Sequence, residues 1–136
     1  MRRVSIVGVP RSVASYAAGQ DLAPAASRSA GLLEQLTRSG LEVHDDGDLT
    51  HEAWRPDRDH PLAQNAGQAT ASLQQLADRL EPLLARGDLA LVLGGNCTIA
   101  VWRARQMAAR DGLDFEAPAV RNPFTEDPPG GLQRAL

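Results

Sequence analysis

The sequence contains no lysine, a single cysteine and few aromatic residues. All 14 basic residues are arginine, and aromatic residues make up 4% of the 136 positions. One cysteine excludes a framework of internal disulfide bonds, and the low aromatic content leaves aliphatic side chains and alanine to form the core. The net charge of −3 provides no basic field for nucleic acid or for an acidic membrane surface, so we expect neither as a partner.

No apolar run approaches the roughly 20 residues that a membrane-spanning helix needs. The N-terminal stretch MRRVSIVGVP has two arginines before an apolar run, but this run is too short for the core of a signal peptide and ends at Pro10. With only one cysteine, these features predict a cytoplasmic protein. The length suits one domain with a modest core.

Three short apolar runs are typical of strands buried on both faces of a parallel sheet. They are VSIVGV at 4–9, LEVH at 41–44 and LALVL at 89–93. The acidic stretch HDDGD at 44–48 contains Asp45, Asp46 and Asp48, which are oxygen donors of the kind that bind metals. We interpret it instead as the turn that ends the second strand, because Asp and Gly favour turn geometry.

Two stretches between these runs have the periodicity of helices. Pro24 opens the first, which keeps small and aliphatic residues on one face until Gly40 ends it. Apolar residues of the second recur at spacings of three and four, at Ala66, Ala69, Leu73, Leu76, Leu80 and Leu83. We expect Pro82 to kink this helix or to start a new turn, and Gly87 to end it.

A further helix is predicted to begin near Thr98, capped by Asn96. Strands that alternate with helices in this order predict a parallel sheet covered by helices on both faces. Beyond Arg103 the pattern degrades, and only 115–120 has any strand character.

Four segments together resemble the arginase/agmatinase (ureohydrolase) family. They are VSIVGVP at 4–10, GQDLAPAASRSAGLLEQLTRSGLEVHDDGDL at 19–49, WRPDRDHPLAQN at 54–65 and LALVLGGNCTIA at 89–100. The last segment stands where the family has Leu-Gly-Gly-Asp-His-Ser. The resemblance implies a three-layer α-β-α fold with a parallel sheet, in an incomplete, truncated form. Residues 1–136 would form one domain, with 103–136 as a divergent tail.

In this family, two manganese ions bind a hydroxide that attacks the guanidine carbon of the substrate and releases urea. The resemblance therefore implies Mn²⁺ as cofactor and a small guanidino compound as substrate. Asn96 stands at the position of the family's aspartate and Cys97 at that of its first ligand histidine, so these two residues are the predicted metal positions. FEAPAVRNP at 115–123 echoes the family's Asp-x-His-x-Asp motif, with Glu116 at the first aspartate. No catalytic or substrate-binding residue is identified.

Cys97 has three interpretations: a buried inert residue, a metal position, or a thiol activated at a helix N-terminus. We favour the buried residue, because a nucleophilic cysteine also needs a base. The candidates for that base are His44, His51 and His60. The group of Asp57, Asp59 and His60 mixes metal-ligand types, but we interpret it as a solvated loop before Pro61.

Three functions follow from these features. The first is hydrolysis of a linear amidine C–N bond, as in the family. The second is a non-catalytic role, as a pseudoenzyme or an interaction protein derived from it. The third is a small thiol- or nucleotide-binding α/β domain built on Gly94, Gly95 and Cys97. An incomplete parallel sheet also leaves one edge unpaired and apolar surface exposed, which predicts either self-association as a homo-oligomer or poor stability.

Overall fold

The computed structural model describes residues 3–15, 17–61 and 64–100. Every described residue lies in the compact unit Met1–Trp102, and the second unit is Arg103–Leu136. The possible strand at 115–120 and Glu116 lie outside the described residues. The assignment of all 136 residues to one domain therefore stays a prediction.

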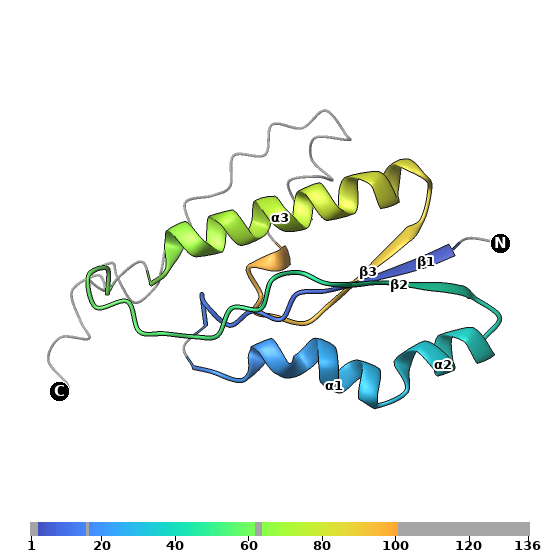
Figure 1. Ribbon diagram of the computed structural model, residues 1–136, viewed down its shortest axis with the longest axis horizontal. Coiled ribbons are helices and arrows are strands. Elements are labelled where there is room, and N and C mark those ends of the chain that lie inside the picture. The colour runs from blue at the N-terminus through green and yellow to red at the C-terminus, as the bar shows by residue number, and fades with distance from the viewer. Residues whose placement is uncertain (1–2, 16, 62–63, 101–136) are drawn as a thin grey trace, which may run out of the picture. The chain divides into compact units, whose positions relative to one another are not determined.

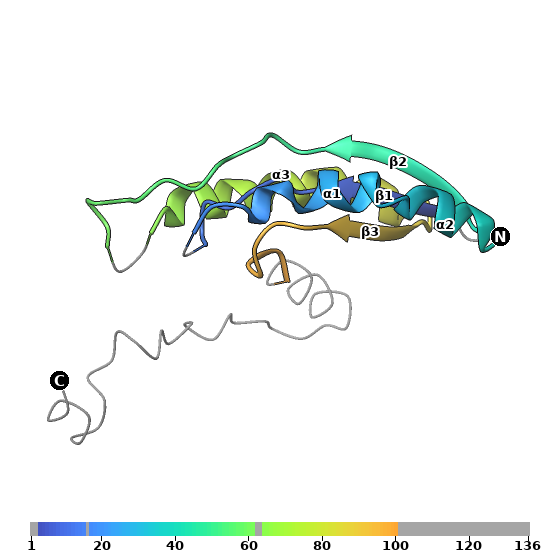
Figure 2. The ribbon, with the colours of Figure 1, turned by 90° about the horizontal axis from the view of Figure 1, so that it is seen from below.

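Three parallel strands form the sheet: β1 (Arg3–Gly8), β2 (Glu42–Asp48) and β3 (Leu89–Leu93). Their order is β2-β1-β3, so β1 is central, as Figure 2 shows. The β1 residue Val4 pairs with Val43 on one side and with Leu89 on the other. The parallel sheet predicted from the apolar runs is confirmed.

Helices cover the two faces of this sheet (Figure 1). One face carries α1 (Ala23–Ser29) and α2 (Leu32–Arg38), which follow the short 3-10 helix η1 (Gln20–Leu22). The opposite face carries α3 (Ala66–Ala85). This arrangement confirms the three-layer α-β-α fold.

Each face of the sheet has its own apolar core. Alternate residues of β1 point to opposite faces, so neighbouring residues of one strand serve both cores. The α3 side buries Val7, Val9, Leu49, Leu76, Leu80 and Leu83. The other side buries Val4, Ile6 and Leu93, against which Leu32, Leu33 and Leu36 pack. The predicted apolar stripe of α3 is therefore a core contact.

The first predicted helix is broken into two. Gly31 has a φ of 82° and forms the left-handed cap at the start of α2. A side chain with a Cβ is disfavoured in that conformation, so glycine permits the break that periodicity alone does not reveal. Gly40 ends α2 with a φ of 82°, as expected.

The prediction that HDDGD ends the second strand is wrong. β2 continues to Asp48, and Asp45 pairs with Ile6 of β1. Arg28 makes this possible because its guanidinium contacts the Asp45 carboxylate at 2.8 Å and that of Asp48 at 2.6 Å. Hydrogen bonding to Arg28 holds the pKa of Asp45 below its ordinary value, so the acidic strand is neutralised locally.

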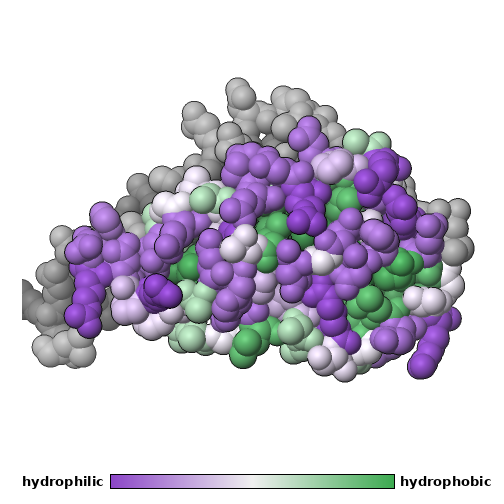
Figure 3. All heavy atoms as spheres, in the orientation of Figure 1, coloured by the Kyte–Doolittle hydropathy of each residue, from purple (hydrophilic) through white to green (hydrophobic). Residues whose placement is uncertain are grey.

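Pro82 lies inside α3, which continues to Ala85 before Gly87 closes it with a φ of 80°, as predicted. The kink expected at Pro82 stays a prediction. None of the helices in the described ranges combines the length and the apolar character needed to cross a lipid bilayer. Hydrophilic residues cover most of the molecular face seen in Figure 3, with smaller apolar areas between them.

Candidate functional site

The carboxyl ends of the strands bring three segments to one edge of the sheet, where open α/β folds usually bind ligands. They are residues 9–15 after β1, 49–52 after β2 and 94–98 after β3. Backbone hydrogen bonds join them. The N–H of Val9 donates to the carbonyl oxygen of Leu93 at 2.9 Å, and that of Ser12 donates to Glu52 at 3.0 Å.

The turn after β3 depends on two glycines. Gly94 and Gly95 have φ values of 69° and 76°. A Cβ at Gly94 would lie 2.7 Å from Cδ of Pro24, and one at Gly95 would lie 2.8 Å from the carbonyl oxygen of Val9. Both conformation and close approach therefore require glycine, which explains the pair as a packing feature.

Asn96 is a helix cap. Its side-chain oxygen accepts hydrogen bonds from the backbone N–H of Thr98, at 3.1 Å, and from the Thr98 hydroxyl. Ile99 and Ala100 then begin a helical turn. The predicted cap is confirmed, and it engages the oxygen through which Asn96 would bind a metal.

Cys97 is exposed and carries a free thiol, so its interpretation as a buried residue is wrong. Asn96 takes the inner position of this turn, with 8% of its surface exposed, and the next residue faces outward. In the described part of the chain, no hydrogen bond joins a histidine to Cys97. Each histidine is paired with a carboxylate instead: His44 with Asp46, His51 with Asp21, and His60 with Asp57.

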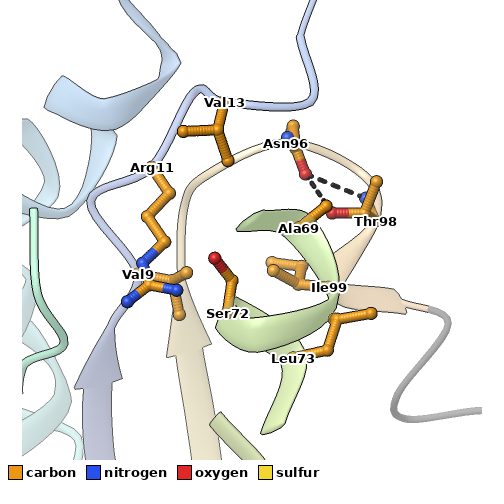
Figure 4. Close-up of a pocket in the computed structure, with 9 residues that line it drawn as sticks. All are labelled: Val9, Arg11, Val13, Ala69, Ser72, Leu73, Asn96, Thr98 and Ile99. Atoms are coloured by element: carbon orange, nitrogen blue, oxygen red, sulfur yellow. Dashed lines mark hydrogen bonds between the residues drawn. The ribbon is translucent and has the colours of Figure 1, made fainter. Parts of the chain in front are cut away.

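A small pocket lies beside the capped turn (Figure 4). Its free volume is about 10 Å³, which is close to the minimum space for one water molecule. The lining residues come from the β1 end, from α3 and from the turn after β3: Val9, Arg11, Val13, Ala69, Ser72, Leu73, Asn96, Thr98 and Ile99.

Arg11 supplies the charge of this pocket, although only 3% of its surface is exposed. Its Nε donates to the carbonyl oxygen of Thr50 at 2.9 Å, and Nη2 donates to Oε1 of Gln75 at 2.5 Å. Glu52 lies 3.7 Å from Nη2. Nη1 has no hydrogen-bond partner among the described residues. The site is therefore built around a buried cation.

A second polar network lies at the same edge of the sheet. The buried Asp21 carboxylate accepts hydrogen bonds from His51 at 2.8 Å and from the Ser12 hydroxyl at 2.9 Å. These two bonds lower the pKa of Asp21 to about 2. The Ser12 hydroxyl in turn accepts a bond from the backbone N–H of Trp54 at 2.8 Å. The network fixes the segment before α1 against the segment after β2.

The Asp57 group forms a loop, as predicted. Oδ1 of Asp57 accepts backbone hydrogen bonds from Asp59 at 3.2 Å and from His60 at 3.1 Å. An aspartate that bonds to the backbone two and three residues ahead stabilises a turn. The Asp57 carboxylate therefore has a local structural role.

The residues present do not fit the manganese pair that the family resemblance implies. Manganese prefers carboxylate, imidazole and water ligands, whereas a thiol is a soft ligand that suits zinc. Asn96 and Cys97 offer an engaged amide oxygen and a thiol, and Arg11 is among the residues that line the pocket beside Asn96. Within the described ranges, no three His, Cys, Asp or Glu side chains are close enough to share a metal ion.

Sequence reasoning did not single out Arg11, Asp21 or Ser12. A partial signal existed for Arg11, because a charged residue directly after a buried strand and a proline lies at the carboxyl edge of a parallel sheet. Asp21 and Ser12 gave no such signal, since their partner His51 lies 30 residues beyond Asp21.

Comparison with known proteins agrees with this architecture. A sequence profile described as "Arginase family" matches residues 2–116. The chain is 34% identical over 104 residues to the arginase of Bacillus caldovelox, covering 74% of this chain and 34% of that protein. It is 31% identical over 100 residues to human Arginase-1, covering 74% of this chain and 31% of that protein.

Solved structures give the same result. The arginase structure from Bacillus cereus matches with a TM-score of 0.67 and 28% identity, over 80% of this chain and 35% of that one. The structure from Bacillus caldovelox matches with a TM-score of 0.67 and 31% identity, over 81% and 38%. The chain thus spans about a third of the length of the relatives that it matches. With a family profile over most of its residues, the chain belongs to the arginase family.

Proposed function

We propose that this chain is a non-catalytic member of the arginase family, an arginase-like α/β module that acts by protein association. The proposal rests on the hydrogen bonding of Asn96 and the exposure of Cys97 in the turn after β3. By the sequence resemblance, Asn96 and Cys97 stand where the family has an aspartate and its first ligand histidine. One is engaged as a helix cap, and the other presents a thiol to solvent.

The charge of the neighbouring pocket supports the same function. Arg11 is buried there, and its nearest carboxylate, that of Glu52, is 3.7 Å away and partly exposed. Manganese and a guanidinium substrate are both cations, and repulsion between like charges is strong where water is excluded. A cation held close to the Arg11 guanidinium would therefore meet unfavourable electrostatics.

Hydrolysis of a guanidino compound is the second candidate, and family membership favours it. It would require manganese ligands from outside the described residues, with Glu116 as the first position to consider. A second polypeptide that carries the missing ligands would be the alternative source. The cytoplasm is the proposed compartment for either function.

Urea release separates the two candidates. The whole purified chain is incubated with arginine or agmatine and excess Mn²⁺, beside the arginase of Bacillus caldovelox as a positive control. We expect no urea above the protein-free reaction. Urea release that depends on manganese, and that a chelator abolishes, would overturn the proposal.

A double variant tests whether Asn96 and Cys97 account for the expected lack of urea release. Asn96→Asp with Cys97→His restores the family's residues at these two positions. We expect this variant to remain inactive, because two restored side chains alone are too few ligands for a pair of manganese ions. Activity in the paired variant alone would show that these two residues account for the loss.

A further inference from the structure

One side of the buried Arg11 guanidinium is bonded to the protein and the other side is not. Nε donates to the carbonyl oxygen of Thr50 at 2.9 Å, and Nη2 donates to Oε1 of Gln75 at 2.5 Å. These two nitrogens share one side of the planar group, and Nη1 lies on the opposite side. Nη1 is buried and has no hydrogen-bond partner among the described residues. Since Nη1 is already shielded from solvent, chain that packs on the outside of this unit does not reach it.

The unbonded side of Arg11 faces the small pocket beside the capped turn. Arg11 and Ser72 both line this pocket. The Glu52 carboxylate lies close to both side chains, at 3.7 Å from Nη2 of Arg11 and 3.3 Å from the Ser72 hydroxyl. Figure 4 shows the guanidinium group beside the Ser72 hydroxyl, with one nitrogen turned towards it. Nη1 is therefore available as a donor to a molecule in the pocket.

A buried charged donor without a partner is unfavourable. Buried polar groups of folded proteins are nearly always hydrogen-bonded, to the protein or to ordered water, and an unpaired charged group costs more than an unpaired neutral one. The free volume of the pocket is about 10 Å³, which is close to the minimum that one water molecule needs. One small molecule in the pocket would supply the partner that Nη1 lacks.

The two hydroxyl groups that line the pocket indicate the chemistry of this molecule. The Ser72 hydroxyl donates to the carbonyl oxygen of Gln68 at 2.8 Å, and the Thr98 hydroxyl donates to Oδ1 of Asn96. A hydroxyl has a single hydrogen, so both groups have only acceptor lone pairs left. Water can accept a hydrogen bond from Nη1 and donate one to a hydroxyl oxygen. An anion such as chloride only accepts, and neither hydroxyl has a hydrogen left to donate to it.

We propose that the pocket binds one ordered water molecule, which accepts a hydrogen bond from Nη1 of Arg11 and donates one to the hydroxyl oxygen of Ser72. Buried waters make two to four such bonds, so these two partners are sufficient. Arg11 belongs to the segment after β1 and Ser72 belongs to α3. The water therefore joins the carboxyl edge of the sheet to the helix that covers one of its faces.

A crystal structure of the whole purified chain, at a resolution that shows ordered water, tests the proposal directly. One crystal is soaked in bromide, because the anomalous signal of bromide distinguishes an anion from water. We expect one water peak within hydrogen-bond distance of both Nη1 of Arg11 and Oγ of Ser72, without anomalous signal. The proposal is overturned if the pocket is dry, if bromide occupies it, or if Nη1 is bonded to a group of the protein instead.

Magnetic relaxation dispersion of ¹⁷O-labelled water, which counts long-lived internal waters, tests the proposal in solution. Arg11→Met should hold one fewer such water than the unmodified chain, because it removes the donor. Arg79→Met is the matched control, since Arg79 is exposed and donates to the carbonyl oxygen of Asp46, and it should leave the count unchanged.

Circular dichroism verifies that both variants keep the fold. An unchanged count in folded Arg11→Met would overturn the proposal, and the crystal structure decides the question if that variant does not fold. Neither measurement depends on urea release or on protein association, so the proposed function is tested separately.

Discussion

The Asp21 carboxylate accepts a hydrogen bond from Nε2 of His51 at 2.8 Å, across 30 residues of sequence. Asp21 is buried in η1, whereas His51 is exposed, so the pair connects the interior to the surface. The Ser12 hydroxyl donates to the other carboxylate oxygen of Asp21. This network fixes the edge of the sheet at which the candidate site lies.

The Asp21 network predicts a loss of stability in acid. The pKa of this carboxyl falls from 3.8 in the unfolded chain to about 2 in the fold. Its contribution is therefore complete above about pH 4 and is lost as the pH falls towards 2. Urea unfolding as a function of pH should show this decline, and Asp21→Asn should flatten it. Asp59→Asn changes an exposed carboxylate and is the control; equal pH profiles for the two variants would contradict the role of Asp21.

Gly94→Ala should destabilise the fold more than Gly87→Ala. Both glycines have a positive φ, but a Cβ at Gly94 would contact Pro24 and Ala23, whereas nothing lies near a Cβ at Gly87. We expect a further loss of about 1–3 kcal/mol in the free energy of unfolding for Gly94→Ala, from overpacking. Denaturant titration measures the difference; equal losses would show that the turn and α1 are not in close contact.

Asn96→Ala should lower the free energy of unfolding by about 0.5–2 kcal/mol, because it removes the cap from Thr98. Asn96→Asp keeps an acceptor oxygen and should be close to the unmodified chain. The comparison is made by urea unfolding at neutral pH. Equal destabilisation by Ala and Asp would mean that the side chain of Asn96 has another role.

Cys97 should react with a thiol reagent in the folded protein, because its side chain is exposed. The rate should not change on addition of denaturant below the unfolding transition. Alkylation followed by mass spectrometry measures it. Modification that required unfolding would place the thiol in the interior.

The hydrophobic pattern of the sequence was sufficient to predict the strands and helices that bury apolar residues. The strand at 89–93 was predicted with its observed bounds, and the apolar stripe of α3 predicted its buried face. Both elements gain their stability from burial, which the periodicity of a sequence records directly.

Contacts between residues far apart in the sequence account for the features that the sequence analysis predicted wrongly or missed. Asp45 and Asp48 belong to a strand because Arg28, from a separate helix, binds both carboxylates. The exposure of Cys97 follows from the capping role of Asn96, its neighbour in the turn. The position of Arg11 beside that turn also depends on strand pairing. None of these contacts can be predicted from the pattern of neighbouring residues in the sequence.

Manganese titration of the purified whole chain by calorimetry, with elemental analysis of the protein as isolated, tests most directly whether this member of the family retains its metal site. We predict no bound manganese and no saturable heat, because Asn96 offers an engaged amide oxygen and Cys97 a thiol where the resemblance places two metal ligands. Tight binding of about two manganese ions per chain would contradict a non-catalytic role and restore hydrolysis as the function.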